Sequence, residues 1–272
     1  MRYSRWWTPL APRLARLVVL CVAVASCSDS RSTGPRGAPD RDGTPDLIVD
    51  EGVLESSVRF ATETISQGSC TSVEGNIPPG TYRTMRFSVS TPNIGDADVF
   101  IGDPRGHIDP NGDGDFADSD GLFDFAACHN HFHYRRYATY ELFQVNSDNS
   151  LGPAMRASKI GFCMQDSEPY RDGIGRSEWV YRQCGSPTQA GNQGLATGWT
   201  DIYDRTLDGQ FFLLNDPRAP VPPGRYALRV TVNPGFVRDP GDPCPVVVDG
   251  LCHVFAESNY SNNVAEIRLT IQ

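Results

Sequence analysis

This chain is almost without lysine. Of its 24 basic residues only Lys159 carries an amine, and arginine supplies positive charge everywhere else. A guanidinium stays protonated and is a poor nucleophile, whereas an amine can lose its proton and form a covalent bond. Lys159 is therefore a candidate for covalent chemistry. The alternative is a lone survivor of a compositional drift toward arginine.

Long apolar runs are missing as well, so no segment is predicted to cross a bilayer as a helix. The apolar run at residues 17–24 is short and follows four arginines, which is typical of a signal peptide, here residues 1–26. Its end, Val24-Ala25-Ser26-Cys27, looks like a bacterial lipobox and predicts lipidation of Cys27. We therefore expect an exported protein, lipid-anchored to the cell envelope or secreted, that meets the membrane through this anchor alone. Ordinary cleavage nearby, with Cys27 free, is the alternative.

Positive charge is in short supply too, since the net charge is −9 before an arginine-rich signal peptide is removed. An acidic surface argues against a nucleic-acid partner and mildly favours cationic ones, although acidity that serves only solubility is the commoner case.

Six cysteines follow Cys27. An even number in an exported chain predicts three disulfides, for which the sequence alone allows 15 pairings.

No segment shows a long, capped period of 3.6 residues, so long helices are not expected. The 26 glycines and 21 prolines favour a turn-rich, all-β architecture. Residues 226–232 and 267–271 alternate as half-buried strands do, and Pro-Pro-Gly at 78–80 and 222–224 predicts turns that begin strands. We therefore predict a mainly β, single β-sandwich-like domain over residues 46–272, with long loops and few short helices. A disordered polar tether at residues 27–45 precedes it.

Three of the five histidines, His129, His131 and His133, fall in one short segment. A helix would turn His131 away from the other two. A strand puts all three on one face but about 6.5–7 Å apart, too far for one ion that lies about 2 Å from each imidazole. The backbone must bend here, or one histidine serves another purpose. Imidazole-rich sites suit copper, zinc, iron or nickel, and copper has the highest intrinsic affinity. A chance surface run of histidines is the alternative.

Five segments, in order along the chain, resemble the catalytic domain of lysyl oxidases. The histidine segment and the strand after it are similar to that family's copper motif, and Lys159 lies in a segment similar to its lysine motif. Tyr203 lies in a segment similar to its tyrosine motif, and two carboxy-terminal segments match as well. The similarity runs from about Asp46 to Ile271, and its segments are residues 123–142, 159–166, 193–203, 223–234 and 257–263.

The resemblance implies an activity. In that family a lysine and a tyrosine fuse into lysine tyrosylquinone, and the match gives these roles to Lys159 and Tyr203, with copper on the three histidines. The implied reaction oxidises a primary amine, peptidyl-lysine or a small amine, with O₂ to an aldehyde and releases H₂O₂ and NH₃. Asp201, two residues before Tyr203, is our candidate general base, because strand spacing would aim both side chains to one side. A carboxylate that only bonds nearby backbone is the alternative.

The resemblance also implies cross-links and a structural calcium ion. It pairs Cys70 with Cys128 and Cys163 with Cys184, and we pair Cys244 locally with Cys252. A calcium cage would join the two ends of the domain, and a β-turn stabilised by asparagines is the alternative. The ligands implied for the cage are Asp46, the Leu47 carbonyl, Glu257, Asn259, Asn262 and Asn263.

Residues 109–120 suggest a second calcium site from their spacing alone. Their oxygen-bearing side chains are spaced as in an EF-hand loop, with glycine at the sharp turn. Flanking helices are not evident, and a solvated acidic loop is the alternative. The candidate ligands are Asp109, Asn111, Asp113, Asp115 and Asp120.

Two other function classes stay open. Three histidines with an open position also describe a zinc hydrolase, although that reading gives no reason for Lys159 and Tyr203 to occupy their motifs. A non-catalytic, metal-binding extracellular or adhesion module is the other class, because the Asn-Tyr-Ser-Asn-Asn ending occurs in many Ig-like domains. Thr139 and Ser158 stand where the lysyl oxidases have histidines, a departure that leaves the implied metal ligands intact but bears on substrate recognition and proton handling. The substrate amine is not predicted.

Overall fold

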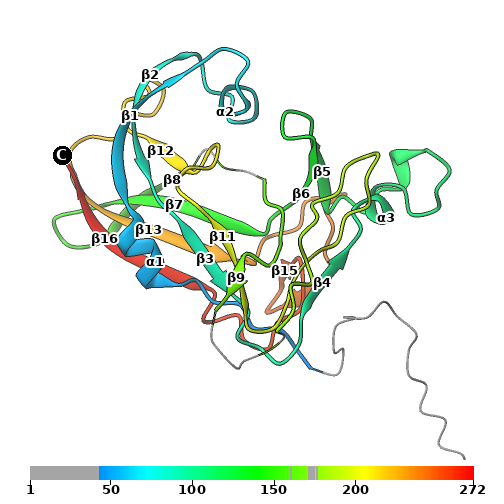
Figure 1. The fold of residues 1–272 in the computed structure, drawn as a ribbon. Helices are drawn as coiled ribbons and strands as arrows, with labels where there is room; N and C mark the ends of the chain where they lie inside the picture. Colours follow the sequence, from blue (N-terminus) through cyan, green and yellow to red (C-terminus); the bar gives the residue numbers. More distant parts are fainter. Residues whose placement is uncertain (1–42, 158, 160, 171–174, 176) are drawn as a thin grey trace, which may run out of the picture. The chain divides into compact units, whose positions relative to one another are not determined.

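A computed structural model describes residues 43–272, apart from residues 158, 160, 171–174 and 176. The predicted signal peptide, Cys27 and the tether up to residue 42 lie outside the described residues. All described residues belong to one compact unit. Strands dominate it and the helices are few and short, which confirms the predicted mainly β domain (Figure 1).

The largest sheet has four antiparallel strands in the order β16–β13–β7–β8. They are β7 (Ala138–Val145), β8 (Leu151–Arg156), β13 (Gly224–Val232) and β16 (Val264–Ile271). In β13 the alternate residues Tyr226, Leu228, Val230 and Val232 are buried. This matches the predicted alternation, because successive side chains of a strand point to opposite faces.

Two three-stranded sheets pack against this sheet, in the orders β3–β11–β9 and β1–β2–β12. Their strands are β1 (Arg59–Ile65), β2 (Gly80–Arg86), β3 (Val89–Pro92), β9 (Glu168–Pro169), β11 (Trp199–Tyr203) and β12 (Phe211–Leu213). Phe87 links the layers: its ring lies 5.3 Å from that of Tyr140 on β7 and 5.6 Å from that of Phe212. The layers therefore share a main apolar core, as in a sandwich, and Ile65, Tyr82 and Phe211 of the β1–β2–β12 sheet form a second, smaller cluster with Ile77.

Three two-stranded antiparallel sheets extend from the loops. They pair β4 (Val99–Gly102) with β10 (Gln193–Leu195), β5 (Phe123–Ala126) with β6 (His131–Tyr134), and β14 (Val246–Val248) with β15 (Leu251–His253). Of these, β5 and β6 form the hairpin that contains the histidine segment.

The helices have one or two turns each. They are α1 (Glu51–Ser57), α2 (Cys70–Glu74), α3 (Arg105–Ile108) and the 3₁₀ turn η1 (Phe116–Asp118). Side chains cap the first two, since Asp50 accepts a hydrogen bond from the Val53 N–H and Ser69 Oγ accepts one from the Ser72 N–H. Within the described residues no helix is long and apolar enough to span a membrane.

The two Pro-Pro-Gly turns begin strands as predicted, and each is closed by a tyrosine. Tyr82 Oη donates to the Pro78 carbonyl (2.9 Å) at the start of β2, and Tyr226 Oη donates to the Pro222 carbonyl (2.7 Å) at the start of β13. The tyrosine, four residues after the first proline of each turn, therefore gives the two Pro-Pro-Gly turns the same closing hydrogen bond.

The ordered domain begins before residue 46. The Thr44 N–H donates to Asp96 Oδ1 (2.7 Å), and the Pro45 carbonyl accepts a hydrogen bond from the Ser258 N–H (2.8 Å). These two residues, placed in the tether from sequence, are therefore attached to the domain, because their backbone groups pair with residues far along the chain.

Candidate metal and cofactor site

The three histidines converge at the end of the β5–β6 hairpin. His131 and His133 lie two residues apart on β6 and share one face. His129 lies in the preceding turn, where its N–H donates to the Ala126 carbonyl (3.1 Å) and Asn130 adopts a left-handed φ of 54°. This turn supplies the bend that the histidine spacing required.

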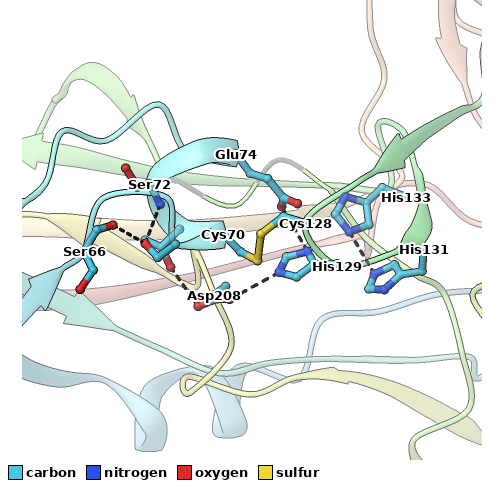
Figure 2. Close-up of a disulfide and its surroundings, with 11 residues drawn as sticks. Ser66, Cys70, Ser72, Glu74, Cys128, His129, His131, His133 and Asp208 are labelled. Atoms are coloured by element: carbon cyan, nitrogen blue, oxygen red, sulfur yellow. Dashed lines mark hydrogen bonds and ion pairs between the residues drawn. A yellow bond between two sulfur atoms is a disulfide. The ribbon is translucent and has the colours of Figure 1, made fainter.

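The histidine rings are close enough to share an ion. One ligand nitrogen from each ring lies within 4.8 Å of the others, and the Nε2 atoms of His131 and His133 are 3.1 Å apart (Figure 2). Burial lowers the pKa of His133 to about 3 and lowers that of His131 below its ordinary value. Both rings are therefore neutral near pH 7, the form that binds a metal.

The remaining ring also fits a metal ligand. Among the described residues, buried Nδ1 of His129 has no hydrogen-bond partner. An unsatisfied nitrogen beside two neutral imidazoles is a donor set that suits a transition-metal ion.

Gly161 lets the lysine segment pack against this site. A Cβ at that position would overlap the imidazole of His133, so any side chain would push the segment away. The next residue, Phe162, is tied to β6 because its carbonyl accepts a hydrogen bond from the Tyr134 N–H (2.6 Å). Sequence reasoning placed Gly161 inside the lysine motif but gave it no role.

Lys159 and Tyr203 are neighbours, although 44 positions apart in number. The Lys159 Nζ lies 5.3 Å from the ring centroid of Tyr203 and 5.5 Å from that of Phe162. Tyr203 is buried, and its hydroxyl donates to the Cys163 carbonyl (3.0 Å). Burial lowers the pKa of the Lys159 amine and raises that of the Tyr203 hydroxyl.

Asp201 lies two residues before Tyr203 on β11 and is 1% exposed. Burial raises the pKa of Asp201 to about 8. In the part of the chain described here, its Oδ2 has no hydrogen-bond partner. Asp201, Tyr203, Lys159 and the three histidines line one cavity of about 300 Å³. The structure thus brings together every residue predicted for the catalytic site.

The disulfides are the three expected pairs, Cys70–Cys128, Cys163–Cys184 and Cys244–Cys252. The first joins α2 to the turn that carries His129, as Figure 2 shows. The second joins the lysine segment to residue 184, which lines the same cavity. Both therefore restrain segments of the site.

Two carboxylates that sequence reasoning missed flank His129. Glu74 Oε2 lies 3.2 Å from Nδ1, but without hydrogen-bond alignment, and Asp208 Oδ2 lies 3.4 Å from Nε2 within hydrogen-bond geometry. Asp208 also groups with His129 and Cys70, but the Cys70 sulfur is bonded to Cys128. A signal for Glu74 existed: it follows Cys70 by four residues, so a helix there would put both on one face.

The residues predicted to bind calcium at the ends of the domain lie close together, but most of them hydrogen-bond to one another. Asn262 Nδ2 donates to Asp46 Oδ1 (2.9 Å), and the Leu47 N–H and Asn263 Nδ2 donate to Glu257 (2.6 and 2.7 Å). Asn259 instead accepts hydrogen bonds from the backbone and side chain of Ser261. Among the described side chains, the buried Oδ1 atoms of Asn262 and Asn263 lack hydrogen-bond partners.

The acidic loop at residues 109–120 is exposed and closes on itself. Asp109 accepts hydrogen bonds from the backbone of residues 112–114, and the side chains of Asn111, Asp113 and Asp115 cap later backbone N–H groups. Asp120 Oδ2 lies 2.6 Å from His107 Nδ1. Within the described residues, no three of its carboxylates converge as the histidines do.

Comparison with known proteins agrees with this arrangement. The family model described as lysyl oxidase matches residues 46–239. Lysyl oxidase homolog 2 of Gallus gallus is 26% identical over 252 residues, which cover 90% of this chain and 25% of that protein. Protein-lysine 6-oxidase of Sus scrofa is 26% identical over 84% of this chain and 78% of its own length. The Homo sapiens protein of that name is also 26% identical, over 84% of this chain and 46% of its own length.

This chain thus spans a quarter of the chicken relative and less than half of the human one. The family match nevertheless covers most of the chain, including the histidine hairpin, Lys159 and Tyr203. The chain belongs to the lysyl oxidase family.

Proposed function

We propose that this chain is a copper- and quinone-dependent amine oxidase. It would convert primary amines, peptidyl-lysine or small amines, to aldehydes with O₂ and release H₂O₂ and NH₃. The observation that carries the proposal is the Lys159 amine, 5.3 Å from the centroid of the Tyr203 ring. Two of the relatives are named protein-lysine 6-oxidases, which supports a lysine side chain as one substrate class.

The chain's own residues suit the assembly of such a centre. His129, His131 and His133 would hold copper, and Lys159 and Tyr203 would carry lysine tyrosylquinone. When present, the two groups supply the two-electron oxidation of the amine and the return of the electrons to O₂. Burial lowers the pKa of Lys159, which favours the neutral, nucleophilic amine that a bond to the Tyr203 ring requires.

We assign proton removal from the substrate carbon to Asp201. Its carboxylate lines the same cavity as Lys159 and Tyr203, so a substrate bound there would lie within its reach. Burial raises its pKa to about 8, which makes the ionised form a stronger base than an exposed aspartate.

Export is part of the proposal. Three disulfides fit an oxidising compartment, and this supports export through a signal peptide at residues 1–26. Lipidation at Cys27 belongs to the proposal on the lipobox sequence alone. Structural calcium at the Asp46–Glu257 end of the domain, and a second ion in the 109–120 loop, also belong to it.

The test is H₂O₂ release from copper-loaded protein given a lysine-containing peptide or a small diamine. We expect activity in the unaltered protein and none in Lys159→Arg, which keeps the charge but cannot form the cross-link. Lys159→Arg should still bind copper, whereas His131→Ala should bind copper more weakly and lose activity.

An active Lys159→Arg variant would contradict the quinone. Hydrolysis without O₂ consumption would indicate a zinc-type hydrolase instead. A folded protein that binds copper and oxidises no amine would indicate a binding module.

A further inference from the structure

Of the three histidines, His129 depends most on contacts with other segments to fix the orientation of its ring. Its two partners lie on β6, whereas His129 lies in the turn before that strand. A side chain in a turn is not oriented by ladder hydrogen bonds, so contacts with other segments must orient its ring. Among the described residues, Asp208 contacts the ring with hydrogen-bond geometry, from Oδ2 to Nε2 (3.4 Å; Figure 2), whereas Glu74 Oε2 lies 3.2 Å from Nδ1 without it.

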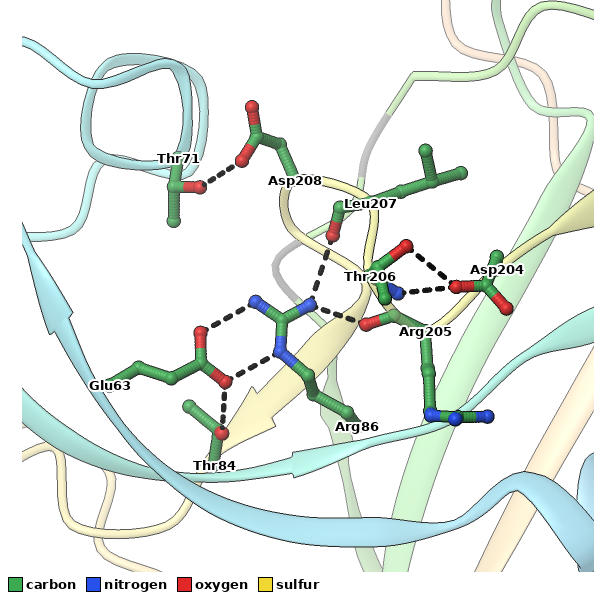
Figure 3. Close-up of polar contacts among 9 residues, drawn as sticks. All are labelled: Glu63, Thr71, Thr84, Arg86, Asp204, Arg205, Thr206, Leu207 and Asp208. Atoms are coloured by element: carbon green, nitrogen blue, oxygen red, sulfur yellow. Dashed lines mark hydrogen bonds and ion pairs between the residues drawn. The ribbon is translucent and has the colours of Figure 1, made fainter.

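Asp208 is itself fixed from two sides, as Figure 3 shows. From α2, Thr71 Oγ1 donates to Asp208 Oδ1 (2.9 Å). From β2, Arg86 Nη1 donates to the carbonyls of Arg205 (2.5 Å) and Leu207 (3.1 Å), within the loop that leads to Asp208. The carboxylate is therefore held although its side chain is 51% exposed.

Glu63 in turn fixes the guanidinium of Arg86. Its two carboxylate oxygens accept hydrogen bonds from Nε and Nη2 of Arg86, each at 2.5 Å, and Oε1 also accepts one from Thr84 (2.7 Å). Bidentate pairs of this kind are among the strongest charge-assisted contacts and fix direction as well as distance. The loop that follows Tyr203 is thus anchored to strands β1 and β2.

We propose that Asp208 is a positioning residue of the metal centre, which holds the His129 ring through Nε2 and leaves Nδ1 for the metal. Histidines that bind metals almost always give their other ring N–H to a carboxylate, a carbonyl or water. Glu74 Oε2 lies 3.2 Å from Nδ1 but is not aligned for a hydrogen bond, so among the described residues Nδ1 has no hydrogen-bond partner, which fits this division of roles. The inference rests on the proposed function and deepens it, because the segment that fixes the metal ligand starts directly after Tyr203.

Copper(II) affinity, measured by competition with a chelator, tests the inference. Loss of an outer carboxylate costs about 10-fold to 100-fold in metal affinity, and we expect Asp208→Asn to lie near 10-fold because Asp208 is half exposed. The electron paramagnetic resonance spectrum of the bound copper should change with it. Asp208→Glu should recover part of the affinity, and the exposed control Asp239→Asn should bind as the unaltered protein does.

A double-mutant cycle tests the route through His129. In a His129→Ala background Asp208→Asn should have no further effect on copper affinity, whereas in a His131→Ala background it should keep its effect. Circular dichroism of each variant separates these losses from unfolding.

Unchanged affinity in Asp208→Asn, or an undiminished effect without His129, would overturn the inference. If the unaltered protein binds no copper, the proposed function fails first and the inference fails with it.

Discussion

Asp201 shows how burial sets chemistry at the scale of one residue. Its folded pKa of about 8 lies far above its ordinary value of 3.8, so the folded protein holds this proton more tightly than the unfolded chain does. The stabilisation that results from this tighter proton binding is fully present below pH 3.8, the ordinary pKa, and is lost as the pH rises through about 8. We therefore expect metal-free protein to lose stability between about pH 6 and about pH 9, and Asp201→Asn to lose less.

Urea unfolding at both pH values measures this difference, and an equal loss in the two proteins would contradict a buried, ionisable Asp201. In the copper-loaded protein, Asp201→Asn should lower the kcat of the proposed amine oxidation by roughly 100-fold to 10,000-fold if Asp201 is the general base. Activity close to that of the unaltered enzyme would leave Asp201 a structural role only.

The residues that could be predicted from sequence are those whose chemistry is rare in this chain. The sequence alone reveals the sole lysine, the three clustered histidines and the tyrosine of the family motif. Asp208 could not be found in this way, because it is one of many acidic residues and its role depends on contacts with α2 and β2. Gly161 was equally hidden, since its function is the absence of a side chain against His133.

At the scale of elements, the Cys70–Cys128 bond connects α2 to the histidine turn across a sequence separation of 58. Removal of both sulfurs (Cys70→Ser with Cys128→Ser) should lower the free energy of unfolding by about 2–4 kcal/mol, because the unfolded chain gains freedom. It should also weaken copper binding, since α2 supplies the Thr71 contact to Asp208.

The matched control is Cys244→Ser with Cys252→Ser, whose sequence separation is only 8. We expect a smaller loss of stability and unchanged copper affinity in this variant, measured by chelator competition and thermal unfolding. Equal effects of the two double variants on copper would contradict a specific role for the α2 link.

Sequence patterns predicted the elements unevenly. Strands β13 and β16 were visible because one face is buried and the other is not. The turn between β5 and β6 could only be inferred as a required bend. Its position depends on Asn130, whose left-handed conformation no periodicity reports.

At the scale of the whole molecule, Glu257 joins Leu47, near the start of the described residues, to the segments beside the last strands. It accepts hydrogen bonds from the Leu47 N–H (2.6 Å) and from Asn233 and Asn263 (2.7 Å each). If calcium binds here, added calcium should raise Tm, because an ion that binds only the folded state stabilises it. Asp46→Ala should remove the part of the gain that comes from this site, and Asp109→Ala should leave that part in place.

Thermal unfolding of the unaltered protein and the two variants, recorded with and without calcium, measures these shifts in Tm. No shift in the unaltered protein would contradict both calcium sites, and a shift lost only in Asp109→Ala would assign the ion to the acidic loop.

The domain as a class was predictable, because alternation and turn residues repeat along the chain. The convergence of its two ends was predictable only from the family resemblance.

Lys159 and Tyr203 are proposed to form a quinone beside copper, and the proposed activity depends on this step. The visible absorption spectrum of purified, copper-loaded protein, recorded before and after phenylhydrazine and beside Lys159→Arg, tests it most directly. We expect a visible quinone band that phenylhydrazine shifts and that Lys159→Arg lacks. A colourless protein that does not respond to phenylhydrazine, yet holds copper through its three histidines, would contradict it.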